Sequence, residues 1–198
     1  MTAHGGLEAA LERGTLRERM VAAAVVMTTE EGWAHVTMAR LAETVGVSRQ
    51  TVYNEIGTKK ALAEAMILAE LDRFLAVVTT AFDDHTGDLV GAIEAATRSV
   101  LEHARGNPLL HAVVSATHGA DTELLPLLTT HSSTLLEVAK AVVTERVAAY
   151  QLRLTPGELD GAIDMVVRVV LSHVMQPSGS PATTAADLAF IARRVLAG

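Results

Sequence analysis

Apolar residues recur along most of the chain at the three- and four-residue spacing of a helix face. In one such run, Met38, Leu41, Ala42 and Val45 fall at positions i, i+3, i+4 and i+7. No segment of alternating apolar and polar residues is bounded by hairpin turns. The pattern predicts an all-α protein of about nine helices, near residues 15–31, 37–45, 48–56, 59–85, 89–105, 108–117, 123–152, 156–175 and 184–196.

Capping residues and helix breakers support these boundaries. Thr15 and Glu18 have the spacing of a capping box, in which each side chain bonds the backbone N–H of the other residue. Thr155 begins a second capping box ahead of the helix expected near residues 156–175. Residues 176–183 are rich in Gly, Pro and Ser, which predicts a loop before the last helix.

Composition narrows the class of protein. The 198 residues include no cysteine, which excludes a disulfide scaffold, a thiolate metal site and a cysteine nucleophile. No run reaches the ~18 apolar residues of a membrane span, and residues 1–14 contain Glu8 and Glu12 and lack the apolar core of a signal peptide. Aromatic residues make up only 3% of the chain, which favours helices over strands. We therefore expect a globular, cytoplasmic protein that is not attached to a membrane.

Charge is distributed unevenly along the chain. The formal net charge of −7 at first argues against a nucleic-acid-binding protein, because phosphates require local positive charge. Among residues 1–62, however, seven Lys or Arg and seven Asp or Glu cancel, so the whole net charge belongs to residues 63–198. Lys59 and Lys60 lie in the neutral part, beside the two short helices expected there. The acidity therefore does not exclude DNA binding by residues 1–62.

The two short helices expected on either side of Gly46 have the features of a helix-turn-helix. Ala42 is small enough for the second helix to cross the first closely, and Gly46 allows the positive φ that the turn needs. Val47 and Val52 are expected to bury the second helix against the first. The alternative is an ordinary helical hairpin, because such a pattern alone is only moderately specific.

The second of these helices has the side chains of a recognition helix. Arg49 can bond guanine and Gln50 can bond adenine, each through two hydrogen bonds to a base edge in the major groove. The hydroxyls of Thr37 and Tyr53, and the ammonium group of Lys59 at a helix N-terminus, suit phosphate oxygens. The residues expected to contact DNA are Thr37, Ser48, Arg49, Gln50, Thr51, Tyr53, Lys59 and Lys60.

Residues 36–62, VTMARLAETVGVSRQTVYNEIGTKKAL, closely resemble the N-terminal signature of TetR-type transcriptional regulators. That signature joins a capping threonine, an Ala-x-x-x-Gly-Val-Ser turn, a tyrosine that ends the recognition helix and a lysine that opens the next helix. The matching residues are Thr37, Ala42, Gly46, Val47, Ser48, Tyr53 and Lys59, followed by the expected Leu62. Two residues depart from it: Ile56 stands where the family usually has phenylalanine, and Lys60 stands where glutamate is common.

The resemblance implies a helix-turn-helix DNA-binding domain at residues 1–62, with a disordered or short helical arm at residues 1–14, and a larger helical ligand-binding and dimerisation domain at residues 63–198. It also implies a homodimeric regulator, most often a repressor, that binds a near-palindromic operator in double-stranded DNA and is released by a small molecule of unknown identity. Two other classes stay open. One is a helical small-molecule-binding protein or enzyme with a vestigial DNA motif, and the other is an activator or architectural protein without a ligand.

Polar residues within apolar stretches of residues 63–198 are candidates for a ligand pocket. Asp121 and Glu123 are the only charged residues between positions 106 and 136, so this stretch is expected to be largely buried, and buried polar groups need partners. The candidates are Arg98, His103, His111, Ser115, His118, His131, Arg168 and His173. The alternative is a structural role, such as an ion pair of Arg168 with Asp164 one turn earlier. The scarcity of aromatic residues favours an aliphatic pocket.

The sequence contains no pattern of a metal site or a catalytic centre. It has eight histidines, but none falls at the H-x-x-x-H, H-E-x-x-H or E-x-x-H spacing that presents a metal pair on one helix. A glycine-rich phosphate loop and a nucleophile elbow are also absent from the sequence. We therefore expect no metal, no cofactor and no enzymatic activity.

The helix expected near residues 156–175 is apolar on nearly every face from Met165 to Met175. Such a helix must be covered on both sides, which points to a second copy of the chain, although a central helix of a monomer is the alternative. The resemblance implies that the last two helices pair with their copies in a four-helix interface. The residues expected there are Val167, Val170, Leu171, Val174, Leu188, Ile191 and Val195.

Overall fold

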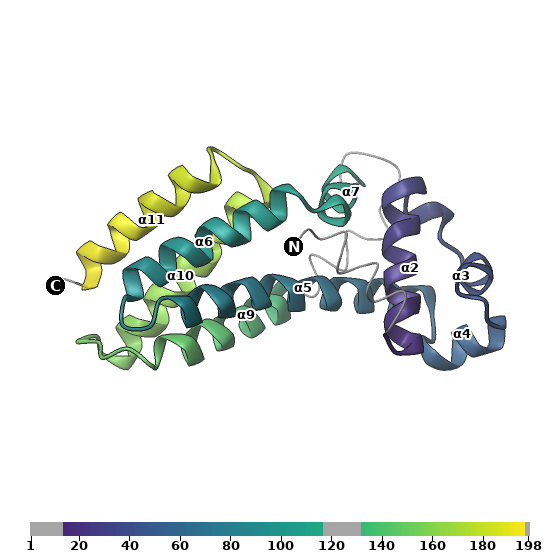
Figure 1. Ribbon diagram of the computed structural model, residues 1–198, viewed down its shortest axis with the longest axis horizontal. Helices are drawn as coiled ribbons and strands as arrows, with labels where there is room; N and C mark the ends of the chain where they lie inside the picture. Colours follow the sequence, from purple (N-terminus) through teal and green to yellow (C-terminus); the bar gives the residue numbers. More distant parts are fainter. Residues whose placement is uncertain (1–13, 117–131, 197–198) are drawn as a thin grey trace. The chain divides into compact units, whose positions relative to one another are not determined.

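The computed structural model describes residues 14–116 and 132–196. Within these residues it has nine α-helices, one 3-10 helix and no strand, which confirms the predicted all-α fold (Figure 1). No helix in this described part is long and apolar enough to cross a membrane. The α-helices are α2 (Leu16–Glu31), α3 (Met38–Val45), α4 (Arg49–Glu55), α5 (Lys59–Asp84), α6 (Leu89–Arg105), α7 (Pro108–Ala116), α9 (Ser132–Val147), α10 (Pro156–Met175) and α11 (Pro181–Leu196), and the 3-10 helix is Trp33–His35.

Contacts divide the described residues into two compact units. The first contains residues 14–71 and 106–116, and the second contains residues 72–105 and 132–196. The first unit extends beyond residue 62, because Leu62 and Met66 at the start of α5 are buried in its core and Leu109 of α7 joins the same core. The assignment of DNA binding to the N-terminal part, and of ligand binding and dimerisation to the rest, stays a prediction.

The helix-turn-helix lies in the first unit, where local sequence signals set its ends. Thr15 and Glu18 form the predicted capping box at the start of α2. Gly46 has the left-handed conformation (φ 76°, ψ 37°), which glycine adopts without the strain of a side chain. The N–H groups of Gly46 and Val47 both bond the carbonyl oxygen of Ala42, at 3.0 and 2.9 Å. These bonds end α3 and turn the chain into α4.

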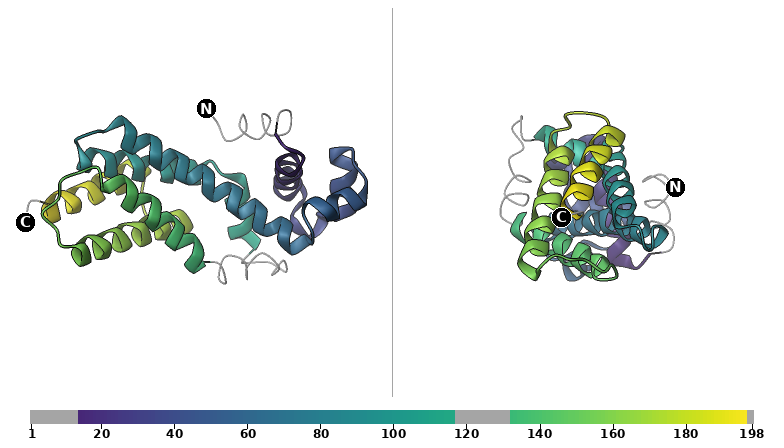
Figure 2. Two further views of the ribbon diagram at one scale, coloured as in Figure 1. Left: turned by 90° about the horizontal axis from the view of Figure 1, so that it is seen from below. Right: turned by 90° about the vertical axis from the view of Figure 1, so that its left-hand side faces the viewer.

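The second unit contains the later part of α5 together with α6, α9, α10 and α11. Helix α11 lies along α6, and α10 packs against α6 and α9 (Figure 2). Two clusters of buried apolar residues lie in this unit, one of Ala81, Phe82, Leu89, Ala92, Ala96 and Val147, and one of Leu136, Ile163 and Val167. Thr155 and Glu158 form the predicted capping box at the start of α10.

Helix α9 ends at Val147, so the prediction of a helix to about residue 152 is wrong at that end. After Val147 the chain turns, and the hydroxyl of Tyr150 donates to the carbonyl oxygen of His85 at 3.0 Å. The Tyr150 ring also packs edge-on against Phe82, with 6.2 Å between the ring centroids. These contacts join residues far apart in the sequence, and no local signal marks them. The expected beginning of this helix, near residue 123, lies outside the described residues.

Helix α11 begins at Pro181, which corrects the predicted start near residue 184 and shortens the expected loop. Ser180 Oγ accepts a hydrogen bond from the N–H of Thr183, at 3.1 Å, and so caps the helix. Pro181 takes the first helical position, where a backbone N–H has no partner within the helix. This start signal is present in the sequence, inside a segment whose Gly, Pro and Ser content predicted a loop.

Candidate nucleic-acid interface

Helix α4, the expected recognition helix, is buried along one side and exposed along the other. Val52 is fully buried and Ile56 leaves only 5% of its surface exposed, and these two residues are one helical turn apart. Arg49, Gln50 and Tyr53 are exposed, Tyr53 by 52% of its surface. The exposed side of α4 therefore offers a guanidinium, an amide and a phenol, which are groups that bond base edges and phosphates.

Ser48 and Thr51 are engaged with each other at the start of α4. Ser48 Oγ accepts from the N–H of Thr51 at 3.0 Å and lies 2.8 Å from the Thr51 hydroxyl oxygen. The first bond satisfies an N–H that the first turn of the helix leaves without a partner. These two hydroxyls fix where α4 begins, and they thereby place Arg49 and Gln50 at its first turn.

Gln50 bonds a residue that the sequence did not single out. Its Nε2 donates to Oδ1 of Asn54 at 2.9 Å, across one turn of the exposed face. The bond leaves the carbonyl oxygen of Gln50 as an acceptor and the amide nitrogen of Asn54 as a donor. An adenine edge requires one donor and one acceptor, so Asn54 belongs with Gln50 in the candidate interface. Its i, i+4 spacing from Gln50 is the signal that finds it.

Lys59 and Lys60, at the start of α5, have different surroundings. The Lys59 ammonium lies 4.8 Å from the centre of the Trp33 ring, a cation–π contact that holds it against the 3-10 helix that follows α2. Lys60 is far more exposed and forms an ion pair with Glu64 one turn later, at 3.9 Å. Such exposed pairs hold their partners weakly. Both lysines therefore lie in the first unit, Lys59 in a fixed position and Lys60 on the open surface.

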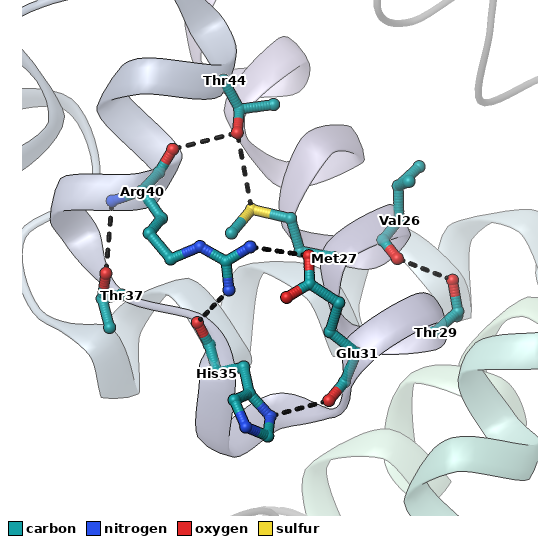
Figure 3. Close-up of polar contacts among 8 residues, drawn as sticks. All are labelled: Val26, Met27, Thr29, Glu31, His35, Thr37, Arg40 and Thr44. Atoms are coloured by element: carbon teal, nitrogen blue, oxygen red, sulfur yellow. Dashed lines mark hydrogen bonds and ion pairs between the residues drawn. The ribbon is translucent and has the colours of Figure 1, made fainter.

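Arg40 ties the first helix of the motif to the residues before it (Figure 3). Its guanidinium donates to the carbonyl oxygen of His35 at 3.0 Å and to a carboxylate oxygen of Glu31 at 2.6 Å. The bond from Arg40 lowers the pKa of the Glu31 carboxyl, and the same contact raises the pKa of Arg40. The backbone N–H of Arg40 also donates to the Thr37 hydroxyl at 3.2 Å, which leaves the Thr37 hydroxyl proton for a phosphate oxygen.

Arg17 is a further residue that sequence reasoning missed. Its guanidinium donates to the carbonyl oxygen of Glu55, the last residue of α4, at 2.5 Å. The last carbonyl groups of a helix lack partners within it, so this bond satisfies one of them. The two residues are 38 positions apart, and no sequence pattern relates them. Arg17 holds the end of the recognition helix against the first turn of α2.

The charged pocket candidates of the second unit have structural partners. Arg98 and Arg168 each bond a carboxylate four residues earlier on the same helix, Glu94 and Asp164, at 2.6 Å. The bond to Asp164 raises the pKa of Arg168, and the pKa of Asp164 is lowered mainly by the same bond. Lys140 of α9 lies 3.2 Å from Asp164 as well. For these arginines, the alternative of a structural ion pair has direct support.

The histidine candidates are divided between the units. In the second unit, His103 packs edge-on against Phe74, with 4.6 Å between the ring centroids, and His173 Nδ1 lies 2.8 Å from a backbone carbonyl oxygen of its own helix. His111 is exposed on α7, in the first unit. Ser115 belongs to α7, but its side chain lies outside the described part, as do His118 and His131. Within the described part, no group of three or more His, Asp or Glu residues forms a metal site.

The residues expected between two copies fall into three classes of exposure. Leu171, Ile191 and Val195 are exposed, and Val170 and Val174 are half-buried. Val167 and Leu188 are buried inside the unit, at 8% and 6% exposure, so their side chains belong to its own core. Other large apolar side chains exposed on the same two helices are Met165, Met175 and Phe190. Among the described residues, helices α10 and α11 therefore carry a set of exposed large apolar side chains.

Two family patterns match most of the chain. The family described as "Bacterial regulatory proteins, tetR family" matches residues 20–66, which contain the helix-turn-helix. The family described as "Bacterial Tetracyclin repressor, C-terminal domain" matches residues 88–194, which cover more than half of the chain. The two matches follow one another along the chain, cover parts of both compact units and leave residues 67–87 between them unmatched.

Individual proteins resemble the chain over most of its length. The HTH-type transcriptional regulator AlkX of Mycobacterium tuberculosis is 28% identical over 177 residues, which are 89% of this chain and 83% of that protein. The crystal structure of the TetR family repressor AlkX from a Dietzia strain, "implicated in biodegradation of n-alkanes", has a TM-score of 0.73 and 25% identity and covers 93% of this chain and 96% of that one. The R. erythropolis repressor QsdR shares the fold, with a TM-score of 0.56, 19% identity and coverage of 89% and 93%.

Proposed function

Because the chain belongs to the TetR family of bacterial transcriptional regulators, we propose that it is a ligand-responsive repressor that binds a near-palindromic operator as a homodimer. The observation that carries this proposal is the exposed face of α4, on a helix that is held at both ends by Ser48 and Arg17. A recognition helix needs this combination, because base contacts require side chains held in a fixed register.

The contacts with DNA follow from the chemistry of each side chain. Arg49, Gln50 and Asn54 face the base edges, and Thr37, Tyr53 and Lys60 bond phosphate oxygens. Ser48, Thr51 and Lys59 act mainly by positioning α4 and the start of α5. The half-sites of the operator lie about 34–36 Å apart, or a multiple of that distance, when each copy places one helix in a major groove.

The second unit supplies the dimer. Leu171 and Ile191 are exposed on α10 and α11, and a surface of such side chains is a typical site of association with another chain. Dimerisation would cover them and would place two recognition helices on one operator. Regulation of this kind takes place in the cytoplasm and involves no catalysis by the chain itself.

The effector that we propose is an aliphatic molecule, bound within residues 63–198. The Dietzia relative is described as a repressor implicated in biodegradation of n-alkanes, and only six of the 198 residues here are Phe, Tyr or Trp. An effector that binds the DNA-incompetent state more tightly releases the operator by shifting the population toward that state. Pocket candidates that bond a carboxylate, such as Arg98, can still bind the effector, which would then compete with that carboxylate.

The proposal is tested by measuring affinity for the chain's own upstream DNA. We expect preference over a random duplex of the same length at moderate salt. The double variant Arg49→Ala, Tyr53→Ala should lose operator binding. The lost base contact of Arg49 reduces the preference about 5- to 150-fold, and the lost phosphate contact of Tyr53 weakens binding to both duplexes. Arg153→Ala is the matched control, because it removes the same charge from an exposed position in the second unit. It should leave affinity unchanged.

The same variants separate the alternative functions. A small-molecule-binding protein with a vestigial DNA motif would show equal affinity for both duplexes, and the double variant would change nothing. An architectural protein or an activator without a ligand would bind DNA, but alkanes and fatty acids of different chain length would not release it. Equal binding of the upstream and random duplexes by the unaltered chain would refute the regulator proposal.

A further inference from the structure

Gln50 and Asn54 form a hydrogen-bonded pair on the exposed side of α4. Gln50 Nε2 donates to Asn54 Oδ1 at 2.9 Å, and both residues are exposed. They are four positions apart, so their side chains are neighbours on one face of the helix. Arg49 and Tyr53 are exposed as well, whereas Val52 is fully buried. The pair therefore belongs to the side of α4 that DNA can reach.

The bond to Asn54 uses one of the two N–H donors of the Gln50 amide. The second N–H and the carbonyl oxygen of Gln50 are a donor and an acceptor on one planar group. The adenine edge in the major groove needs this set, since N6 donates and N7 accepts, and one glutamine amide bonds both atoms. The alternative takes the donor from the amide nitrogen of Asn54, but no planar group fixes its distance from the Gln50 oxygen.

The bond to Asn54 also restricts the orientation of the Gln50 amide before DNA binds. An exposed glutamine loses rotamer freedom when it is fixed. That loss weakens binding less when the side chain is already held in the orientation that the complex requires. Ser48 fixes the backbone at the first turn of α4 through its bond to the N–H of Thr51. Both the backbone and the side chain of Gln50 are thus held by neighbours on the same helix.

We propose that Asn54 is a positioning residue for Gln50, and that this pair specifies an A·T base pair at one position of each operator half-site. Gln50 contacts the adenine, and Asn54 acts through Gln50 by holding its amide. The proposal rests on the proposed function, because it assigns a base pair to the exposed side of α4. It deepens that function by naming the preferred base and the residue that sets the strength of the preference.

The test begins with a selection of duplexes by the full-length protein from a library with random bases over both half-sites. Affinities for single selected duplexes are then measured. In the unaltered chain, we expect one position in each half-site at which A·T is preferred over G·C about 5- to 150-fold. Gln50→Ala should abolish this preference. Asn54→Ala should reduce it about 2- to 12-fold, which is the effect of leaving one side chain free to rotate.

Asn54→Asp separates the positioning role from a direct contact with the base. A carboxylate still accepts the bond from Gln50, but it has no N–H to donate. Its charge weakens binding to the A·T and G·C duplexes alike, so the ratio of the two affinities reports the preference alone. We expect Asn54→Asp to keep the ratio of the unaltered chain within about twofold, the range within which independent effects add.

A double variant tests whether Asn54 acts only through Gln50. In Gln50→Ala, Asn54→Ala, the preference should equal that of Gln50→Ala, because Asn54 then has no amide to hold. Gln151→Ala is the matched control, since it removes the same amide from an exposed position in the second unit. It should leave the preference unchanged. The urea midpoint of Trp33 fluorescence, which reports the first unit, should be the same in all these variants.

Each outcome decides for or against the pair. Equal binding of the upstream and random duplexes by the unaltered chain refutes the proposed function and, with it, this assignment. Preference for the upstream duplex without an A·T position that depends on Gln50 refutes the assignment alone. An unchanged preference in Asn54→Ala also refutes it, because Gln50 would then need no partner. A preference lost equally in Asn54→Asp and Asn54→Ala refutes the positioning role, because the amide of Asn54 would then donate to the base itself.

Discussion

Replacement of Gly46 by alanine should destabilise the first unit by about 1–2 kcal/mol through the backbone alone. Gly46 has φ 76° and ψ 37°, a conformation that costs an ordinary L-residue about that much. A Cβ built on Gly46 meets no atom within 4 Å. Steric contact with neighbours therefore adds nothing, and the expected loss is the conformational cost of the left-handed turn.

The chain contains its own probe for this measurement. Trp33 is its single tryptophan and is 3% exposed in the core of the first unit, so its fluorescence reports the unfolding of that unit. In urea, Gly46→Ala should lower the midpoint of the Trp33 transition while the slope stays the same, because the surface exposed on unfolding does not change. Gly46→Asn should cost less, since asparagine tolerates the left-handed region better than alanine.

Gly161→Ala is a matched control with the opposite expected sign. Gly161 lies on an exposed position of α10, and a Cβ built there also meets no atom within 4 Å. In a helix, alanine should stabilise the second unit by about 0.5–1 kcal/mol, as seen by circular dichroism, and leave the Trp33 transition unchanged. The urea midpoint of the Trp33 transition could also be the same in Gly46→Ala and the unaltered chain. That result would show that the left-handed turn does not hold α3 and α4 in place.

Three further outcomes are expected. Thr155 lowers the pKa of the Glu158 carboxyl, mainly through its side-chain hydrogen bond, so the stability that Glu158 contributes is present above its unfolded pKa and is lost as the pH falls through its folded pKa. Glu158→Gln should flatten this acid-side loss in thermal melts below about pH 5. Tyr150→Phe should cost about 0.5–1.5 kcal/mol in urea unfolding, because it removes the bond to His85. Ile191→Glu should shift the protein from dimer to monomer in analytical ultracentrifugation, and an unchanged dimer would exclude that part of α11 from the interface.

The features predicted from the sequence are those that local signals specify. Gly46, the cap of Thr37 and the capping box of Thr15 each act within about four residues, and the structure has all three. The buried side of α4 also follows from spacing, because Val52 and Ile56 are one turn apart. Short-range hydrogen bonding and helix periodicity are therefore sufficient to predict the helix-turn-helix and the side of α4 that faces outward.

The features missed are those that depend on contacts between distant residues. The bond from Arg17 to Glu55 spans 38 positions, and the bond from Asn107 to Glu70 spans 37. Helix α9 ends where Tyr150 turns back to His85, 65 residues earlier. No periodic pattern in a single sequence relates residues that lie so far apart along the chain. The arginines proposed for a pocket are a different case, because their partners are local. The i, i+4 spacing already offered the ion pair of Arg168 with Asp164 as the alternative, and Arg98 bonds Glu94 at the same spacing.

The charge of the first unit bears on how the chain would distinguish its operator from other DNA. The ion pair with Glu31 offsets the charge of Arg40. Arg17 and Lys59 are held in place by a backbone carbonyl group and by the Trp33 ring. Non-specific affinity rises with the number of phosphates neutralised, and residues 1–62 carry no net positive charge. Discrimination between operators must then come from the fixed position of a few side chains on α4. Arg40 and Arg17 serve that end, because they hold α3 and α4 against α2.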